Sequence, residues 1–153
     1  MRSNENKALS DNERLLGALL RIPYQALTVR IQQGLVEQGH PEFHASHLRV
    51  LQHIEPTGSR LSDLTEDAQM TKQAINYLIE YLEEQGYVLR VADKSDGRAK
   101  IIHLTDLGRL CEQQAREIIK QTEAEWATHL GQSRMELLRE TLRDLAALIE
   151  TAS

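Results

Sequence analysis

The stretch that most constrains the fold runs from Asp96 to Gly108 and reads Asp-Gly-Arg-Ala-Lys-Ile-Ile-His-Leu-Thr-Asp-Leu-Gly. Asp96-Gly97 is a favoured dipeptide for a tight hairpin turn of type I′, in which both central residues need positive φ. The flanking segments 89–91 and 100–104 are apolar and rich in β-branched residues, which favours paired strands. The sequence therefore predicts a β-hairpin that turns at this dipeptide.

The predicted hairpin is basic, although the whole chain is acidic. The 153-residue chain carries a formal net charge of −5. Between Tyr87 and Arg109, however, five cations face three acids, so the local charge is +2. A cationic hairpin suits a polyanionic partner, and so small an excess predicts moderate, salt-sensitive binding.

Two short helices joined by a tight turn precede the hairpin. The apolar spacing and the capping residues predict helices over residues 11–38, 45–54, 62–68 and 72–85, with Thr71 as N-cap and Gly86 as the stop of the last one. Helices over 62–68 and 72–85 form a helix-turn-helix pattern. A helix-turn-helix followed by a basic hairpin is a winged helix, whose natural partner is double-stranded DNA.

The first helix and two more helices after the hairpin need a further apolar surface to cover them. The last helix carries apolar residues at spacings of three and four, close to a heptad seam. We therefore expect a single domain over residues 1–153, mainly α with a small β-hairpin wing: dimerisation helices at 11–38 and 106–150 flank a winged helix-turn-helix unit at 45–105, and two copies form a homodimer. The alternative is a helical bundle within one chain.

Polar residues near the start of the predicted recognition helix are candidates for reading bases. Gln73, Asn76 and Tyr77 lie at i, i+3 and i+4 on the face opposite the apolar stripe. Gln and Asn amides can bond both N6 and N7 of adenine in the major groove. The alternative is an ordinary solvated helix face. The predicted DNA-binding residues are Thr71, Lys72, Gln73, Asn76, Tyr77, Lys94, Asp96, Arg98 and Lys100.

Arg98 stands two residues after Asp96, across the predicted turn. This spacing lets the carboxylate hold the guanidinium by a charge-assisted hydrogen bond. An Arg held at a wing tip suits a narrow minor groove, where the negative potential is strongest. The alternative is an ordinary surface salt bridge, which stabilises a hairpin little.

The pattern Asp96-x-Arg98, then Leu104-Thr105 and Gly108, resembles the wing signature of the MarR family of transcriptional regulators. The similarity extends upstream through Leu-Ser-Asp-Leu at 61–64, Thr-Lys-Gln-Ala at 71–74 and Leu-Glu-Glu-Gln-Gly at 82–86. The resemblance implies a triangular homodimer that binds a pseudo-palindromic operator, most often as a repressor. Two positions depart from the family pattern, since Gln69 stands where Gly is common and Tyr77 where a basic residue is common.

The resemblance also implies a pocket for a small phenolic or anionic effector between the dimerisation helices and the winged helix. The candidate pocket residues are Tyr24, His47, Arg49 and Trp126. The alternative for each of them is a packing or surface residue, which is the more frequent role of such side chains.

Two alternative functions stay open at this stage. His40, His44 and His47 have spacings that suit a metal-responsive regulator, although a solvated His-rich loop explains them better. A winged helix can also serve only as a protein-interaction module. We find no catalytic motif and expect neither enzyme activity nor a cofactor or resident metal. The single cysteine, Cys111, lies on an apolar stripe, so we expect a buried, inert thiol. The sequence shows no apolar leader and no membrane span, which predicts a cytoplasmic protein.

Overall fold

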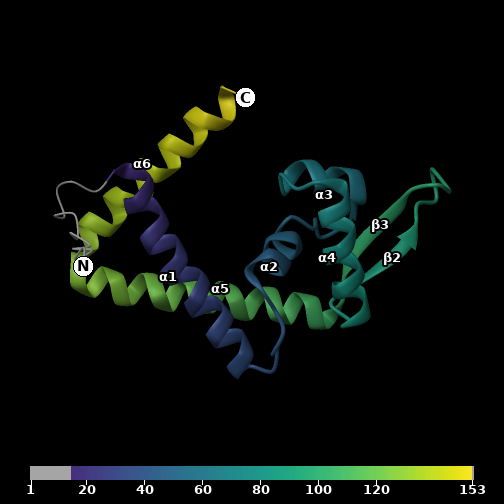
Figure 1. Cartoon of the computed structure of the whole chain (residues 1–153), viewed down its shortest axis with the longest axis horizontal. Helices are drawn as coiled ribbons and strands as arrows, with labels where there is room; N and C mark the ends of the chain where they lie inside the picture. The colour runs from purple at the N-terminus through teal and green to yellow at the C-terminus, as the bar shows by residue number, and fades with distance from the viewer. Residues whose placement is uncertain (1–14, 153) are drawn as a thin grey trace, which may run out of the picture.

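The computed structural model describes residues 15–152 and places a winged helix-turn-helix unit at one end of a long helical scaffold (Figure 1). Residues 11–14 of the first predicted helix lie outside the described part. The elements, in chain order, are α1 (Leu16–Glu37), α2 (Ala45–Gln52), β1 (Ser59–Arg60), α3 (Leu61–Asp67), α4 (Lys72–Glu84), β2 (Val88–Ala92), β3 (Lys100–Leu104), α5 (Asp106–Leu130) and α6 (Gln132–Thr151). The predicted fold class, mainly α with a small β wing, is confirmed.

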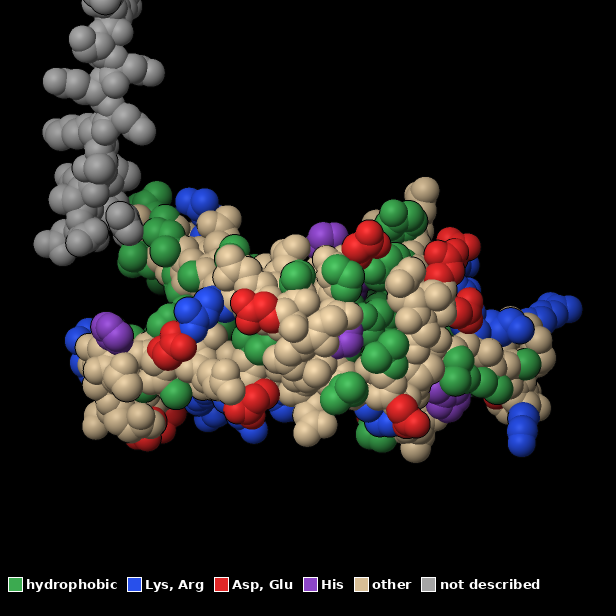
Figure 2. Space-filling model, turned by 90° about the horizontal axis from the view of Figure 1, so that it is seen from below, with side chains coloured by type: hydrophobic (Ala, Val, Ile, Leu, Met, Phe, Trp, Pro, Cys, Tyr) green, Lys and Arg blue, Asp and Glu red, His purple; other side chains and the backbone are tan. Residues whose placement is uncertain are grey.

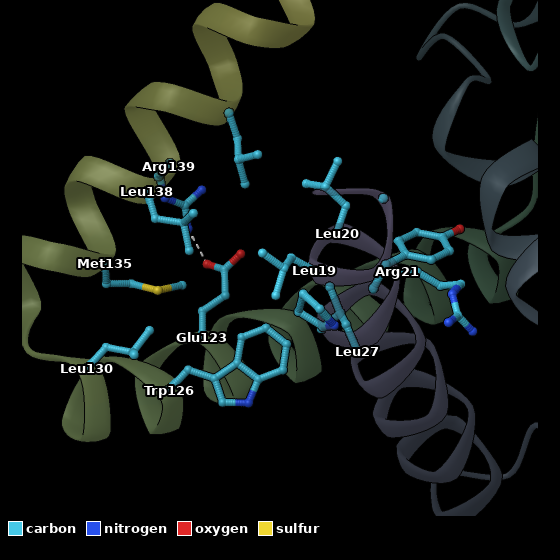
Figure 3. Close-up of a pocket in the computed structure, with 14 residues that line it drawn as sticks. Leu19, Leu20, Arg21, Leu27, Glu123, Trp126, Leu130, Met135, Leu138 and Arg139 are labelled. Atoms are coloured by element: carbon cyan, nitrogen blue, oxygen red, sulfur yellow. Dashed lines mark hydrogen bonds and ion pairs between the residues drawn. The ribbon is translucent and has the colours of Figure 1, made fainter. Parts of the chain in front are cut away.

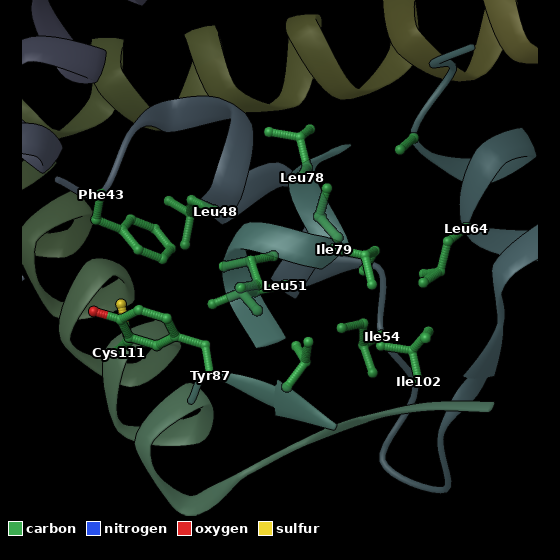
Figure 4. Close-up of a cluster of buried hydrophobic side chains, with 14 of the residues drawn as sticks. Phe43, Leu48, Leu51, Ile54, Leu64, Leu78, Ile79, Tyr87, Ile102 and Cys111 are labelled. Carbon is green, nitrogen blue, oxygen red and sulfur yellow. The ribbon is translucent and has the colours of Figure 1, made fainter. Parts of the chain in front are cut away.

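The core of the winged unit is aliphatic and centres on α4. Its predicted stripe, Ile75, Leu78, Ile79 and Leu82, is buried, with Leu82 completely inaccessible. Side chains from α2, α3, α5 and the sheet pack against this stripe (Figure 4). Because the apolar face of α4 is enclosed in this way, its opposite face is held toward solvent.

The helix ends follow from local chemistry. The Thr71 hydroxyl accepts a hydrogen bond from the Ala74 N–H at 3.1 Å, and Gly86 adopts a φ of 82° just beyond the last turn of α4. Thr105 caps α5 in the same way, through the Gly108 N–H at 3.1 Å. The predicted N-cap and C-terminal stop of α4 are confirmed.

The wing contains one strand more than the predicted hairpin. The antiparallel sheet has the order β1-β3-β2, with Arg60 of β1 opposite Ile101 and Val88 of β2 opposite Leu104. β1 has only two residues, too few to give a periodic signal in the sequence. It attaches the wing to the start of α3.

The predicted type I′ turn is wrong. Gly97 does not adopt positive φ, and β2 and β3 are joined by a longer loop over residues 93–99. The Asp93 N–H donates to the Ala99 carbonyl at 3.0 Å, and the Ala99 N–H donates to the Asp96 carbonyl at 3.0 Å. The two strands lie where they were predicted, but a compact seven-residue loop forms the wing tip in place of a two-residue turn.

A buried polar link joins three segments that are distant in the sequence. His40, in the loop after α1, donates from Nε2 to Gln114 Oε1 of α5 at 2.8 Å, and its Nδ1 accepts from the Tyr87 hydroxyl at 2.6 Å. His40 and Tyr87 are both buried. Because both ring nitrogens have partners, the link fixes the base of the wing against α5 at little desolvation cost.

His47 lies beside this link, in the first turn of α2. Its Nδ1 accepts from the His44 N–H at 2.9 Å, and its ring stacks on Tyr81 of α4 with the centroids 4.3 Å apart. Burial, and secondarily the neighbouring His44, lower the pKa of His47 from 6.5 to about 4. The ring is therefore held in its neutral form.

The outer helices leave much apolar surface uncovered. α6 has no buried residue, and Figure 1 shows it rising away from α5 at the end of the molecule opposite the wing. The exposed apolar side chains of α1 and α6 include Leu16, Leu19, Leu20, Ile22, Tyr24, Leu137, Leu138, Leu142 and Leu148. No helix within residues 15–152 is both long and apolar enough to cross a membrane.

We predict that the free energy of unfolding decreases as the pH is lowered from about 6.5 to about 4, and that His47 accounts for part of this decrease. Over this range the unfolded chain binds a proton at His47 and the folded chain does not, so acid favours unfolding. In His47→Gln, which keeps a capping-box side chain, the free energy of unfolding should vary less with pH. Urea unfolding across this range measures the slope. Leu48→Val is the control on the same helix: it should lower the free energy of unfolding but leave its slope against pH unchanged. If the slope of His47→Gln equals that of the unaltered protein, the prediction is wrong.

Candidate nucleic-acid interface

The outward face of α4 presents the polar residues that the sequence singled out. Lys72, Gln73 and Tyr77 are exposed, and Asn76 is half-buried. Tyr77 is 73% exposed, which is unusual for an aromatic side chain on a packed helix. The first turn of α4 also has free backbone N–H groups, which attract anions. The start of this helix can therefore meet both base edges and phosphates.

The wing carries its cations at the far end of the molecule. Lys94, Arg98 and Lys100 are exposed, and Figure 2 shows Lys and Arg side chains gathered at this end. Among residues 15–152, none of these three side chains has a hydrogen bond or an ion pair with an acid. They are free to contact a polyanion.

The predicted contact between the Asp96 carboxylate and the Arg98 guanidinium is wrong. Asp96 Oδ1 instead accepts the backbone N–H of Arg98 at 3.1 Å. This is the usual local hydrogen bond of an Asp side chain in a turn, made to the backbone two residues on. Asp96 therefore shapes the loop, and the guanidinium stays in solvent.

The carboxylate of the wing loop (residues 93–99) that does pair with an Arg is Asp93, which was not among the residues predicted from the sequence. Its Oδ2 accepts from Arg60 Nη2 at 2.7 Å, and its Oδ1 accepts from the Ser95 N–H at 3.0 Å and the Ser95 hydroxyl at 2.7 Å. The hydrogen bonds from Ser95, and then the one from Arg60, lower the pKa of Asp93 below its usual value. Asp93 therefore connects β1 to the root of the wing loop.

Arg60, Lys72, Arg98 and Lys100 come together around one cleft of about 470 Å³. Its other lining residues are Leu61, Ser62, Thr65 and Ala99, so the lining contains no acid. The cleft joins the start of the recognition helix to the wing. Lys72, Arg98 and Lys100 were predicted from the sequence. Arg60 was not, because the only feature that marks it in the sequence is its position directly before the start of a helix.

Gln69, one of the two departures from the family pattern, occupies a left-handed position. Its φ is 52°, and no other non-glycine residue in the described chain has positive φ. The Met70 N–H donates to the Thr65 carbonyl at 3.3 Å and the Gln69 N–H to the Glu66 carbonyl at 3.1 Å, which is the Schellman pattern at the end of α3. This position favours Gly, so Gln69 adds strain to the turn before α4.

We predict that Gln69→Gly raises the free energy of unfolding by about 1 kcal/mol, because glycine adopts the left-handed conformation without strain. Chemical denaturation of the two proteins measures the difference. The control is Gln85→Gly at the end of α4, where φ is −83° and glycine should give no gain. Equal or lower stability of Gln69→Gly would show that its side chain compensates for the strain.

The four predicted effector-pocket residues do not form one site. Tyr24 and Trp126 line a largely apolar cavity of about 980 Å³ between α1, α5 and α6. Figure 3 shows leucines of α1 facing Leu138 and Trp126 across it, with the ion pair of Glu123 and Arg139 at one side. His47 is instead buried against Tyr81, and Arg49 is exposed on α2.

The metal alternative is contradicted by the placement of the histidines. Both nitrogens of His40 are engaged with Tyr87 and Gln114, and His47 Nδ1 binds the backbone of His44. Within residues 15–152, no group of three His, Cys, Asp or Glu side chains is placed to hold a metal ion. Cys111 is buried, as predicted, and burial raises the pKa of its thiol to about 12.

These elements define a winged helix-turn-helix protein with a cationic cleft between recognition helix and wing. Comparisons with known proteins show which family of winged helix-turn-helix proteins this chain resembles. Residues 42–99 match the model of the MarR family, and the resemblance seen in the sequence is thereby confirmed. The structure of the whole described chain is similar to solved structures of MarR-family regulators, so its fold is that of this family. No curated protein sequence matches the chain.

Three solved structures illustrate the similarity. A structure of MarR is 23% identical with a TM-score of 0.81, covering 94% of this chain and 97% of the other. Streptococcus pneumoniae FabT in complex with DNA is 17% identical with a TM-score of 0.77, covering 90% and 97%. A probable transcriptional regulator from Pseudomonas aeruginosa is 25% identical with a TM-score of 0.70, covering 88% and 98%.

Proposed function

We propose that this protein is a sequence-specific transcriptional regulator that binds a pseudo-palindromic DNA operator as a homodimer and represses by occupying it. The observation that carries the proposal is the cleft at which Lys72 of α4 meets Arg98 and Lys100 of the wing. In a chain with a net charge of −5, such a concentration of unpaired cations suits a polyanion. The similar FabT structure is itself a complex with DNA, which supports the same partner here.

In this proposal α4 lies in the major groove and the wing reaches the flanking minor groove. Gln73 and Asn76 offer amides to base edges, and Tyr77 offers a ring to a thymine methyl or a hydroxyl to a phosphate. Arg98, whose guanidinium has no acidic partner among the described residues, enters the minor groove. Lys94 and Lys100 contact the backbone beside it.

The DNA-binding proposal predicts different effects for two kinds of variant. Arg98→Ala should weaken operator binding by about 1.5–3 kcal/mol per lost charged contact. Gln73→Ala or Asn76→Ala should cost about 1–3 kcal/mol at particular base pairs. Fluorescence anisotropy with the upstream intergenic fragment and single-base variants measures both. Lys120→Ala on the exposed face of α5 is the control and should bind normally.

Two outcomes would contradict parts of this proposal. If the unaltered protein shows no sequence-selective binding even at low salt, the winged helix serves only as an interaction module. If Gln73→Ala and Asn76→Ala weaken binding equally on every sequence, these side chains contact the backbone and do not read bases.

The homodimer is supported by the apolar surface of the outer helices. Leu19 and Leu20 of α1 and Leu138 and Leu142 of α6 are partly exposed and line the same apolar cavity. A monomer that left this much contiguous apolar surface in water would be prone to association. A second copy presents the same helices, so the two copies can cover each other about a two-fold axis.

We predict that a Leu138→Asp, Leu142→Asp double variant is monomeric at micromolar concentration, because two carboxylates would have to be buried in the contact. Sedimentation equilibrium measures the mass, and circular dichroism checks that the helices persist. Leu110→Asp is the control: Leu110 is similarly exposed but lies on the N-terminal half of α5. A double variant that remains dimeric would place the interface elsewhere.

Release by a small phenolic or anionic effector is the remaining part of the proposal. Tyr24 and Trp126 supply aromatic surface in the cavity between α1, α5 and α6, and Arg21 supplies a positive charge. Arg139 also lines the cavity but is paired with Glu123. An aromatic anion bound there would lie among the helices that hold the two copies together. Binding would therefore alter the spacing of the two recognition helices.

A further inference from the structure

The cleft at the root of the wing has a feature that base reading and minor-groove insertion do not explain. Arg60 lies on β1, directly before α3, and belongs neither to α4 nor to the wing loop. It nevertheless lines the same cleft as Lys72, Arg98 and Lys100. Four cationic side chains therefore line one cleft.

Repulsion between these cations is only partly relieved within the protein. Asp93 accepts one hydrogen bond from Arg60, at 2.7 Å, and its carboxylate is otherwise occupied by Ser95. Within residues 15–152, neither Lys72 nor Lys100 has a recorded ion pair. Like charges gathered in this way are stabilised when an anion enters between them.

The geometry of Arg60 suits a phosphate. A guanidinium has five N–H donors in a fixed fork, and the recorded contact with Asp93 uses one nitrogen, Nη2. The side chain of Arg60 is 47% exposed, whereas that of Asp93 is 12% exposed. Asp93 therefore fixes the side chain from the protein side, and the remaining donors of Arg60 stay accessible from the cleft.

Ser62 and Thr65 of α3 also line the cleft. The Thr65 hydroxyl donates its proton to the Leu61 carbonyl at 2.9 Å, whereas Ser62 is exposed and can offer its hydroxyl as a donor. Neutral donors beside cations are the usual lining of phosphate sites in nucleic-acid complexes. The cleft thus has both the charge and the donors that one phosphodiester requires.

We propose that this cleft is a phosphate seat, which holds one backbone phosphate of the bound duplex between Arg60, Lys72 and Lys100. Asp93 is its positioning residue: it holds Arg60 in the cleft and attaches the wing loop to β1 through Ser95. The proposal rests on the proposed DNA binding and adds a third contact to the recognition helix and the wing tip. This contact sets the register of the duplex without reading its sequence.

The first test is the salt dependence of operator binding by the full-length protein. Each phosphate neutralised on B-form DNA contributes about 0.9 to the slope of log K against log salt. In Arg60→Gln the slope should decrease in magnitude by about 0.9 for each protomer, and the loss of affinity should be the same on every operator variant. Lys120→Gln removes the same charge from the far part of α5 and should leave the slope unchanged.

The second test identifies the phosphate. Neutral methylphosphonates are placed one at a time along the operator, and affinity is measured for the unaltered protein and for Arg60→Gln. One position should weaken the unaltered protein more than it weakens Arg60→Gln, because the substitution has already removed the Arg60 part of that contact. Inorganic phosphate and a free nucleoside monophosphate, tested as competitors, distinguish a backbone site from a site for a small phosphorylated ligand.

The outcomes separate this inference from the function on which it rests. If the unaltered protein binds no DNA at low salt, the proposed function fails and the seat fails with it. If it binds DNA normally but Arg60→Gln keeps the slope, or every methylphosphonate is additive with the substitution, only the seat is overturned. Competition by free phosphate or by the monophosphate at micromolar concentration would overturn the assignment to the DNA backbone. Circular dichroism of Arg60→Gln checks the fold, and Arg60→Lys should restore part of the slope.

Discussion

The structure depends on the burial of one face of α4. Ile75, Ile79 and Leu82 are completely inaccessible, and burying an aliphatic side chain of this size stabilises a protein by about 1.5–3 kcal/mol. Their partners come from α2, α3, α5 and the sheet, so the helix is fixed from several directions. Because rotation of α4 would expose this stripe, the direction in which Gln73 and Tyr77 point is a consequence of core packing. The candidate recognition surface is therefore as rigid as the core behind it.

Local charge matters more than net charge in this molecule. At physiological ionic strength, exposed charges are largely screened beyond about 8 Å. The acids of α5 and α6 therefore weaken the field at the wing only slightly, and the four cations of the cleft dominate there. Asp93 is the carboxylate closest to this group, and it is tied to Arg60 and Ser95. An acidic chain can in this way present a locally basic surface.

α5 connects the two functional parts. It begins at the wing, where Thr105 caps it, and ends at Gly131, where a φ of 92° turns the chain into α6. The buried link from His40 to Tyr87 and Gln114 attaches the base of the wing to this helix. A change in the packing of the outer helices would therefore be carried along α5 to the winged unit.

The local sequence was sufficient to predict the main elements and most of the candidate site. Apolar residues at helical spacing identified the stripe of α4, Thr71 and Gly86 marked its ends, and the basic hairpin indicated a wing. The errors concern contacts that are not encoded by neighbours in the sequence. The Asp-Gly dipeptide favoured a type I′ turn, but the pairing of the Asp93 N–H with the Ala99 carbonyl set a longer loop. The predicted pair of Asp96 with the Arg98 guanidinium failed for a related reason, since the Asp96 carboxylate accepts the backbone N–H of Arg98 instead.

The sequence by itself determined which segments are helical, which face of each helix is apolar and where the cations lie along the chain. These properties depend on spacing and capping within a few residues. Only the tertiary structure decided that Arg60 meets Asp93, that His40 meets Tyr87 and Gln114, and that Tyr24 and Trp126 share a cavity without His47. Such pairs are separated by tens of residues, and they meet because the burial of the common core brings their elements together.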